Sequence, residues 1–484
     1  MKILIVSFTD DNFGDNLIRI CFENLLKVVL KNHNITDYEI NKMPLKRVDP
    51  ILVKNSDYIF FAGGGLFGLS YLNFFEFIDE ITKIADENNI PVIFSSLGIN
   101  NMDATEEAEQ VLKDILKRKC IKAISVRENL ELFEKYAQGC DFKIEEACDP
   151  AVWTKYVYGM LNNTTENIIG INVVRGGLFK DNKKNWGLTN EMDYLYNLKC
   201  LLDKKKLKYK FYTNGSFLDN NTLRFFAKKY DIPNNQVEYI HTTRELVETI
   251  SKFKAIAAFR MHTSIVAYSF NIPSVALAWN DKIPFFYQKI NQPERALDFE
   301  NWDSDIVFKN LCTSLKDKDP KEKEYQEYLM TVYKYLYNVV STFILKNDEQ
   351  AVDNIFDFKT ITKLLIKQSP TINEDEDDLR FKLNKGEKKY LGNFIKLRDQ
   401  DSKISKFEKE ISTLKSMYDV LDVEKDVLIG EIDELKTKND ESIDKIDELN
   451  ALNSIQKKEL DRLNKLLIIR FLRRVKRLFS HKKR

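Results

Sequence analysis

Short apolar runs alternate with segments of helical periodicity through the first 155 residues, and this alternation restricts the chain to a parallel sheet covered by helices. The runs Ile3–Phe8, Asp57–Ala62 and Ile90–Ser96 are mostly apolar, as in strands that are buried on both faces. Amphipathic segments separate them, which is the pattern of βαβ units. The other predicted elements are a strand at Lys122–Val126 and helices at Asn16–Leu30, Phe74–Glu87, Glu106–Arg118 and Glu128–Tyr136.

The same alternation restarts after Asn162–Thr165, so we predict a second α/β domain. A chain of 484 residues is long enough for more than one domain. We expect Rossmann-like domains at 1–160 and 161–368 that face each other in a GT-B-like arrangement, with the carboxyl ends of their strands lining the cleft. The predicted strands of the second domain are Ile168–Val174, Lys208–Thr213, Val237–Ile240, Ala255–Phe259 and Ser274–Trp279, and its helices are Glu191–Lys204, Asn220–Lys229, Glu245–Lys252, Thr263–Phe270, Tyr325–Leu345 and Asn354–Lys367.

A heptad pattern begins at Ile404, after a predicted linker at 369–402. Fourteen of its twenty a and d positions are apolar, which is typical of a coiled coil. We predict the coiled coil at 403–465, and Asn439 and Asn453 at a positions favour a homodimer in fixed register. The alternative is a single helix that charge pairs along its surface hold together.

The final segment, 466–484, has the pattern of a basic amphipathic helix. Ten Lys and Arg residues and no acidic residue lie between Arg462 and Arg484, whereas the rest of the chain carries 65 basic and 74 acidic residues. Because only the tail is basic, we expect it to bind an anionic membrane surface, and we expect no nucleic-acid binding by the body of the protein. The alternative is a solvated end of the coiled coil that is basic by chance.

The sequence indicates no membrane span, disulfide framework or metal site. No stretch approaches the ~18 apolar residues that a span requires, and the first apolar run ends at Asp10-Asp11, which argues against a signal peptide. The six cysteines form no C-x-x-C pair and are expected to be reduced thiols of an intracellular protein. We therefore predict a cytoplasmic protein that lies at the inner face of the cell membrane through its tail.

Arg260-Met261-His262 is the strongest candidate for a functional motif. It lies between the predicted strand Ala255–Phe259 and the helix that follows, and His262 is one of only four histidines. The N-terminus of a helix attracts anions, and an imidazole titrates near neutral pH and can transfer protons. The alternative is an arginine and a histidine that serve only the packing of a strand end.

Two polar or glycine-rich segments follow strands of the first domain. Asn12, Gly14 and Asp15 lie in the segment after the first strand, which contains more polar residues than one helix cap requires, and Gly14 would allow a tight or positive-φ turn. Gly63-Gly64-Gly65 would let backbone amides approach a ligand. This run does not match G-x-G-x-x-G and no P-loop Lys-Ser/Thr follows it, so it does not support nucleotide binding. A tight connection between strand and helix is the alternative.

Cationic side chains follow strands of the second domain at the same edge of the predicted sheet. Arg175 ends the first strand of this domain, and Lys282 lies in the polar loop after its last strand. If Arg175 and Arg260 open onto one cleft together with His262, the three side chains suit a small dianionic or trianionic ligand such as a phosphorylated carboxylate.

These residues follow the order found in the polysaccharide pyruvyl transferase family, which the chain resembles over roughly residues 1–300. The resemblance rests on Asn12-Phe-Gly-Asp15, Gly63-Gly-Gly-Leu66, Asp149-Pro150-Ala151, the strand-terminal Arg175, Arg260-Met-His262 and the turn Asn271-Ile272-Pro273. It implies a GT-B-like fold and a transferase that moves the pyruvyl unit of phosphoenolpyruvate onto a sugar, usually as a ketal. The acceptor would be a cell-surface glycan or its lipid-linked precursor in exopolysaccharide biosynthesis at the cell envelope.

The resemblance also implies roles for individual residues. Arg175 and Arg260 would hold the phosphate and carboxylate of phosphoenolpyruvate, and His262 would act as general acid or base. From its place in the facing domain, Asp15 is our candidate for orienting or deprotonating the acceptor. The further predicted substrate-binding residues are Asn12, Gly14, Gly63, Gly64, Gly65 and Lys282. Phosphoenolpyruvate is then a co-substrate, and neither a cofactor nor a metal is expected.

Two other functions fit the same architecture. A GT-B glycosyltransferase would use a nucleotide sugar, although Arg175, Arg260 and His262 suit a small anion better than a base and a ribose. A non-catalytic scaffold would act through its coiled coil, and substitution of His262 would leave its cellular role intact.

Overall fold

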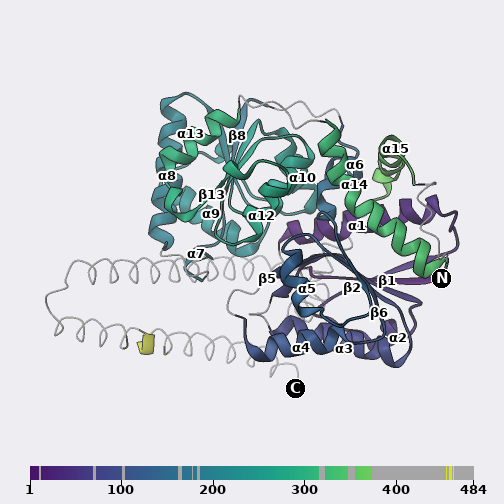
Figure 1. The fold of residues 1–484 in the computed structure, drawn as a ribbon. Helices are drawn as coiled ribbons and strands as arrows, with labels where there is room; N and C mark the ends of the chain where they lie inside the picture. Colours follow the sequence, from purple (N-terminus) through teal and green to yellow (C-terminus); the bar gives the residue numbers. More distant parts are fainter. Residues whose placement is uncertain are drawn as a thin grey trace, which may run out of the picture. The chain divides into compact units, whose positions relative to one another are not determined.

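The computed structural model of the chain describes its two α/β domains and little of the C-terminal region. The described residues are 1–9, 12–68, 72–100, 104–161, 166–176, 178–181, 186–315, 322–346 and 355–372, with Ser454, Lys457–Glu459 and Arg462. Contacts divide the chain into two compact units, Met1–Ile404 and Ser405–Arg484. Apart from the few residues given for the second unit, the predicted coiled coil at 403–465 and basic tail at 466–484 lie outside the described residues (Figure 1).

The first domain contains a seven-stranded sheet in which each described strand pair is parallel. The strand order is β2-β1-β3-β5-β6-β7, and β4 pairs with the carboxyl end of β5. Ile3 of β1 pairs with Tyr58 of β3, and Ile59 of β3 pairs with Val92 of β5. The strands are β1 (Lys2–Ser7), β2 (Glu39–Pro44), β3 (Tyr58–Phe61), β4 (Gly64–Gly68), β5 (Val92–Asn100), β6 (Ile121–Val126) and β7 (Lys143–Glu146).

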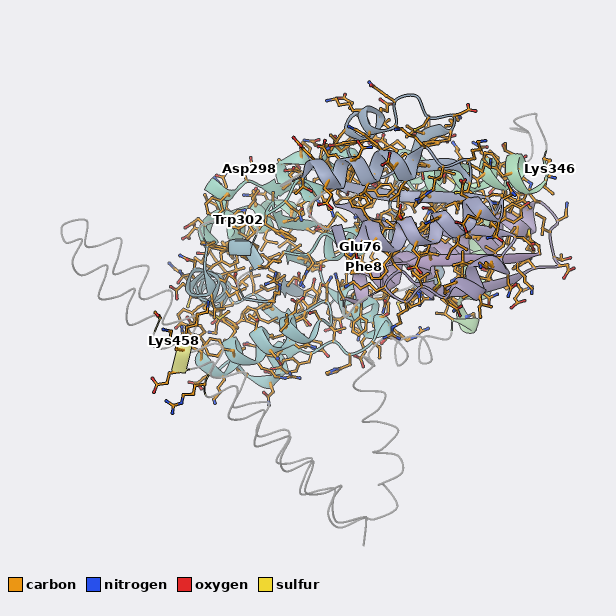
Figure 2. All side chains as sticks on the ribbon, turned by 90° about the horizontal axis from the view of Figure 1, so that it is seen from below. Phe8, Glu76, Asp298, Trp302, Lys346 and Lys458 are labelled. Atoms are coloured by element: carbon orange, nitrogen blue, oxygen red, sulfur yellow. The ribbon has the colours of Figure 1, made fainter. Side chains whose placement is uncertain are left out.

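Helices cover both faces of this sheet. Ile3 and Ile5 of β1 belong to the apolar cluster that also contains α1, whereas Leu4 and Val6 belong to the cluster under α3 and α4. All four side chains are buried, which explains the continuously apolar run in the sequence. Side chains fill the space between sheet and helices (Figure 2). The helices are α1 (Phe13–Asn32), α2 (Pro50–Lys54), α3 (Leu72–Glu87), α4 (Glu106–Leu116) and α5 (Leu130–Tyr136).

The second domain repeats this design with a six-stranded parallel sheet. Its order is β10-β9-β8-β11-β12-β13, and β8 lies between β9 and β11. The strands are β8 (Ile168–Asn172), β9 (Lys208–Tyr212), β10 (Val237–Glu238), β11 (Ala255–Ala258), β12 (Ser274–Leu277) and β13 (Ala296–Leu297). The helices are α7 (Leu178–Asp181), α8 (Leu188–Lys204), α9 (Phe217–Lys229), α10 (Thr243–Lys252), α11 (Met261–Ser269), α12 (Lys282–Lys289) and α13 (Ser304–Ser314).

The chain returns to the first domain after α13. The hydroxyl of Tyr335 on α14 donates a hydrogen bond of 2.7 Å to the carbonyl of Phe94 on β5. The indole of Trp153 donates one of 2.8 Å to the carbonyl of Leu329, also on α14. Helix α14 lies against α1 (Figure 1), so it completes the core of the first domain. The segments in this region are a 3-10 turn (Pro150–Trp153), α6 (Thr154–Val157), α14 (Glu322–Val339), a π-helical turn (Val340–Ile344) and α15 (Phe358–Gln368).

The predicted α/β class is confirmed, with two sheets whose described strand pairs are all parallel. The predicted start of the first helix is wrong. Helix α1 begins at Phe13 and not at Asn16, because the Asn12 side chain caps it by accepting a hydrogen bond from the Gly14 amide at 3.1 Å. The run Gly63–Gly65 is also not the tight connection between strand and helix that is the alternative interpretation, since β4 begins at Gly64. Within the described residues, no helix is long and apolar enough to cross a membrane.

Candidate active site

His262 lies between two carboxylates that the first domain supplies. Its imidazole is buried, with 6% of the residue exposed, in the first turn of α11. The Nδ1 atom lies 3.8 Å from Oδ1 of Asp15, and Nε2 lies 3.7 Å from Oδ2 of Asp149. Among the described residues, Nε2 has no hydrogen-bond partner. The ring is therefore held at the junction of the two domains with a nitrogen available to a ligand.

Gly14 allows this close approach. It lies within α1 and does not have a positive φ, so the predicted role in a tight or positive-φ turn is wrong. A Cβ atom at position 14 would lie 2.6 Å from both Cβ and Nδ1 of His262. Any larger residue at this position would therefore displace the imidazole or separate the domains.

Asp15 follows Gly14 in the first turn of α1, and its carboxylate faces the second domain. Its pKa is raised above the ordinary 3.8 because burial disfavours the charged form. Four neighbouring groups act in the opposite direction without cancelling the effect of burial. These groups are His262, Arg127, Arg260 and Lys282. Asp15 is thus a carboxylate surrounded by cationic side chains.

A buried ion cluster supports the other side of His262. Arg127, directly after β6, donates from Nη1 to Oδ2 of Asp149 and from Nε to Oε2 of Glu128, the latter at 2.8 Å. Burial raises the pKa of Asp149, but the charges of Arg127 and His262 and hydrogen bonds outweigh it, so the pKa is lowered to about 2. Burial lowers the pKa of Arg127, and the two carboxylates more than reverse this and raise it. Asp149 therefore stays ionised beside the imidazole.

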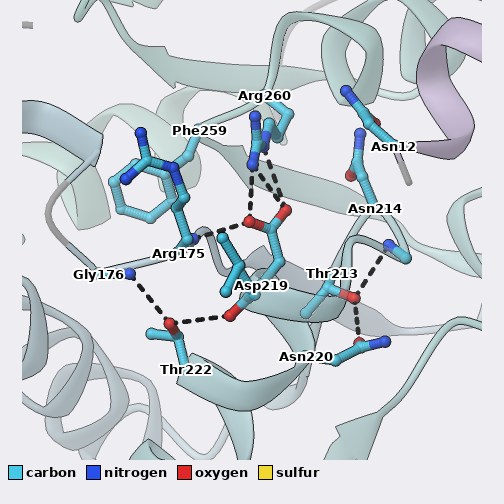
Figure 3. A network of polar contacts seen from close by, with 12 residues as sticks. Asn12, Arg175, Gly176, Thr213, Asn214, Asp219, Asn220, Thr222, Phe259 and Arg260 are labelled. Carbon is cyan, nitrogen blue, oxygen red and sulfur yellow. Dashed lines mark hydrogen bonds and ion pairs between the residues drawn. The ribbon is translucent and has the colours of Figure 1, made fainter. Parts of the chain in front are cut away.

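Arg260 is oriented by an acidic side chain of α9. Its Nη2 atom donates to both carboxylate oxygens of Asp219 at 2.6 and 2.9 Å, and Nε donates to Oδ2 at 3.2 Å (Figure 3). The backbone amide of Arg175 also donates to Asp219, at 2.8 Å. Asp219 therefore brings Arg175 and Arg260 together, as Figure 3 shows. The Nη1 atom of Arg260 has no hydrogen-bond partner in the described part of the chain.

Arg175 does not end a strand, contrary to the prediction, because β8 stops at Asn172. Asn172, the last residue of β8, supports the neighbouring site residues through its side chain. Its Oδ1 atom accepts a hydrogen bond from the Arg260 amide at 3.1 Å, and its Nδ2 atom donates to Asn214 at 3.1 Å. The carbonyl of Asn214 accepts a hydrogen bond from the Phe13 amide at 3.1 Å. This chain of bonds joins Arg260 to the start of α1 across the domain junction.

Lys282, the first residue of α12, extends toward the glycine run of the first domain. A Cβ atom at Gly65 would overlap its Nζ atom. Gly63 and Gly64 have φ values of 98° and 94°, which favour glycine, so the three glycines serve backbone geometry and space for the ammonium group. Burial lowers the pKa of Lys282, and the carboxylates of Glu128 and Asp15 oppose that shift. In the described residues, no group of His, Cys, Asp and Glu side chains could hold a metal ion.

Sequence reasoning missed four contributors to this site, namely Arg127, Glu128, Asp219 and Asn172. In the sequence, Asp149 stands out only within the motif Asp149-Pro150-Ala151, and it has no predicted role in the site. Arg127, Glu128 and Asn172 share one feature that could have identified them, since each lies at or directly after the carboxyl end of a parallel strand, where ligands bind in such folds.

Comparison with solved structures finds similar folds at low sequence identity. A UDP-GlcNAc 2-epimerase from Neisseria meningitidis matches with a TM-score of 0.44 and 12% identity, covering 72% of this chain and 100% of that chain. A putative UDP-N-acetylglucosamine 2-epimerase from Listeria monocytogenes gives 0.48 and 10%, covering 74% and 99%. A UDP-GlcNAc 2-epimerase from Methanocaldococcus jannaschii gives 0.44 and 13%, covering 69% and 100%. These similarities carry no argument about activity, and no curated protein matches the sequence.

The comparison with protein families does identify the chain. The model described as "Polysaccharide pyruvyl transferase" matches residues 12–281, more than half of the sequence. The matched range contains Asn12, Asp15, Asp149, Arg260 and His262 and ends one residue before Lys282. The chain therefore belongs to the polysaccharide pyruvyl transferase family, and membership implies a transferase.

Proposed function

We propose that the protein transfers the pyruvyl unit of phosphoenolpyruvate to a sugar of a cell-surface glycan or its lipid-linked precursor, forming a pyruvate ketal. The observation that carries this proposal is the position of His262, buried between Asp15 and Asp149 at the N-terminus of α11. An imidazole and carboxylates lie there beside cationic side chains. A reaction that protonates the anionic phosphoenolpyruvate requires groups that give and take protons and cations that bind the substrate.

Arg260 and Arg175 bind the phosphate and carboxylate of the donor in this proposal. Asp219 engages Nε and Nη2 of Arg260, so the guanidinium is fixed while Nη1 points to the ligand. A guanidinium held in this way loses little freedom when it binds an anion. Lys282 adds a third cation from the same domain, and the N-terminus of α11 adds its partial positive charge. Asn12, Gly14 and Gly63–Gly65 shape the wall of the first domain that faces the donor and acceptor.

The reaction balances with these groups. His262 gives a proton to the methylene carbon of phosphoenolpyruvate, and a sugar hydroxyl attacks the adjacent carbon while Asp15 takes its proton. Asp15 returns that proton to His262 across the 3.8 Å between them. The bond from this carbon to the phosphate oxygen then breaks, and a second hydroxyl of the same sugar closes the ketal. One hydroxyl proton ends on the new methyl group and the other on the released phosphate.

The test is phosphate release from phosphoenolpyruvate with a panel of para-nitrophenyl hexosides and N-acetylhexosaminides, together with calorimetry of donor binding and mass spectrometry of the sugars. We expect acceptor-dependent phosphate release and a sugar that has gained one pyruvyl group. The proposal fails if the folded protein does not bind phosphoenolpyruvate. Turnover of a nucleotide sugar in its absence would instead support a GT-B glycosyltransferase.

Asp15→Asn is expected to lower kcat roughly 100-fold and to change its pH dependence. Asp15 accepts a proton only when ionised, and burial raises its pKa above 3.8, so the wild-type rate should fall on acidification at a pH above that value. The variant should lack this acid limb. Because a carboxyl group with a raised pKa costs stability once it is ionised, the variant should unfold at an equal or higher temperature at neutral pH. Asp114→Asn, on the exposed face of α4, is the control.

Persistence of the acid limb and of full turnover in Asp15→Asn would remove this residue from the mechanism. The measurement is a set of initial rates across pH with saturating phosphoenolpyruvate, which isolates kcat from changes in donor binding.

We further propose that 403–465 pairs two copies of the chain and that 466–484 binds the anionic inner face of the cell membrane. Support comes from the heptads and from the ten basic residues after residue 461. A chain that ends at Ser402 is expected to be monomeric and to lose binding to phosphatidylglycerol vesicles. Salt should weaken vesicle binding by the full chain, because charge screening reduces the attraction. Equal vesicle binding by both chains would contradict the membrane role.

A further inference from the structure

Glu128 carries a buried carboxylate oxygen that the chemistry described so far does not use. The residue follows Arg127 at the end of β6 and is 3% exposed. Its Oε2 atom accepts a hydrogen bond of 2.8 Å from Nε of Arg127. Its Oε1 atom is buried and has no hydrogen-bond partner among the residues that the structure describes. A buried carboxylate oxygen without a donor is costly, so this atom requires an explanation.

The space around Oε1 is provided by a glycine. A Cβ atom at Gly98 on β5 would overlap Oε1 and would lie 3.1 Å from Nη2 of Arg127. The backbone of Gly98 does not have a positive φ, so conformational freedom is not what the glycine supplies. Its hydrogen side chain keeps open the place that the carboxylate occupies.

Lys282 reaches the neighbouring strand β4 from the second domain. Its Nζ atom lies where a Cβ atom of Gly65 would be. Gly65 is on β4 and Gly98 is on β5, and these strands pair with Gly64 opposite Leu97 and Phe67 opposite Ile99. The ammonium group and the carboxylate therefore lie over two paired strands, next to the register shift between Gly64 and Phe67. Glu128 is also the charge that most strongly opposes the effect of burial on the pKa of Lys282.

The two charged groups nevertheless form no ion pair with each other. Neither the ammonium group of Lys282 nor the Oε1 atom of Glu128 has a hydrogen bond or an ion pair in the described part of the chain. A hydroxyl group is the ligand that suits such a gap, because it donates one hydrogen bond to a carboxylate and accepts another from an ammonium group. A phosphate or carboxylate could contact the lysine but not Glu128.

We propose that Oε1 of Glu128, assisted by Lys282, binds the second hydroxyl of the acceptor sugar, the one that closes the ketal ring. This inference rests on the proposed function, in which Asp15 faces the first hydroxyl. Asp15 lies beside His262, Glu128 lies beside Gly98, and Lys282 extends from the second domain over Gly65. In the proposal, the two carboxylates hold two hydroxyls of one sugar.

The two carboxylates divide the reaction between them. Glu128 accepts a hydrogen bond from the second hydroxyl during the first addition and takes its proton as the ketal closes. Glu128 then gives that proton to the released phosphate. The bond that breaks in the reaction joins the central carbon of the pyruvyl unit to the phosphate oxygen. Glu128 therefore selects acceptors whose two hydroxyls are spaced to reach both carboxylates.

The experiment compares wild type with Glu128→Gln on the para-nitrophenyl sugar that wild type converts, and on its mono-deoxy analogues as inhibitors. The inhibition constant of an analogue is measurable even when it cannot form a ketal. We expect Glu128→Gln to weaken the acceptor roughly 10- to 100-fold, as for a lost hydrogen bond to a charged group, with unchanged binding of phosphoenolpyruvate. The analogue that lacks the second hydroxyl should have the same inhibition constant for wild type and for Glu128→Gln.

Two further variants separate this role from a structural one. Gly98→Ala should displace the carboxylate and reproduce the same selective loss, whereas Glu131→Gln, at an exposed position of α5, should behave as wild type. An equal loss for every analogue, or weaker binding of phosphoenolpyruvate in Glu128→Gln, would show that Glu128 only supports Arg127 and would overturn the proposal. Failure of wild type to release phosphate from phosphoenolpyruvate with any sugar would instead remove the proposed function itself.

Discussion

His262→Ala is expected to lower kcat by roughly 100- to 10,000-fold while the folded protein still binds phosphoenolpyruvate. The imidazole is the group whose two nitrogens face Asp15 and Asp149, and neither carboxylate can replace it as the donor of a proton to carbon near neutral pH. Arg260, which contacts the donor in our proposal, keeps its own partner Asp219 in the variant. The variant should therefore lose turnover and keep its affinity for phosphoenolpyruvate.

The measurement is single-turnover phosphate release with saturating donor and acceptor, beside calorimetry of donor binding. His241→Ala is the matched control, because His241 is exposed and lies two residues before α10. A kcat in His262→Ala close to that of wild type would exclude the imidazole from proton transfer.

Arg127→Met is expected to lower the free energy of unfolding by about 3–5 kcal/mol, the usual cost of removing one partner from a buried ion pair. Arg127 and Asp149 are 5% and 3% exposed, and the substitution leaves two buried carboxylates without their cation. In a domain of this size, such a loss corresponds to a fall of roughly 10 °C in the unfolding temperature. Chemical denaturation at neutral pH would measure it.

The pH dependence of this contribution has a definite sign. Because the pKa of Asp149 is lowered to about 2, its stabilisation is complete above the ordinary carboxyl pKa of 3.8 and is lost as the pH falls toward 2. Arg127→Met should weaken this acid dependence. The triple variant with Glu128→Gln and Asp149→Asn should be more stable than Arg127→Met alone, because it leaves no buried charge unpaired.

A partly exposed ion pair provides the comparison. Lys210 and Glu238 are 32% and 40% exposed, and Lys210→Met should cost no more than about 1 kcal/mol. If Arg127→Met were as mild as Lys210→Met, the cluster around Asp149 would not be the stabilising feature that its burial indicates.

The elements that the sequence predicts well are those whose burial shows in a short window. Both β1 and β11 are buried along almost their whole length, and their apolar runs reveal them. In contrast, β2 at the edge of the first sheet is mostly half-buried or exposed, and its residues Glu39–Pro44 have no strand pattern. The same holds for β7, which has no buried residue. Edge strands depend on their neighbours and not on their own composition.

The site residues also divide into those that the sequence reveals locally and those that it does not. His262 and Asp15 could be proposed from their places after strands, and the structure brings them within 3.8 Å. Arg127 and Glu128 resemble the start of an exposed helix in the sequence. They are buried because Asp149, which lies 22 residues after Arg127, neutralises that guanidinium. A long-range charge pair of this kind leaves no local pattern, and the same is true of Asp219 beside Arg260.

The return of α14 to the first domain has a consequence for how the protein is made. The indole of Trp153 donates its hydrogen bond to the carbonyl of Leu329, which lies 176 residues further along the chain. The carbonyl of Phe94 accepts its hydrogen bond from the hydroxyl of Tyr335, which lies 241 residues further along. The first domain therefore leaves the ribosome with an unfinished core and an uncovered face, and it stays in that state until the second domain has been translated. Chains with such incomplete cores aggregate readily, so the risk to newly made protein is concentrated in this interval, when a chaperone is most useful.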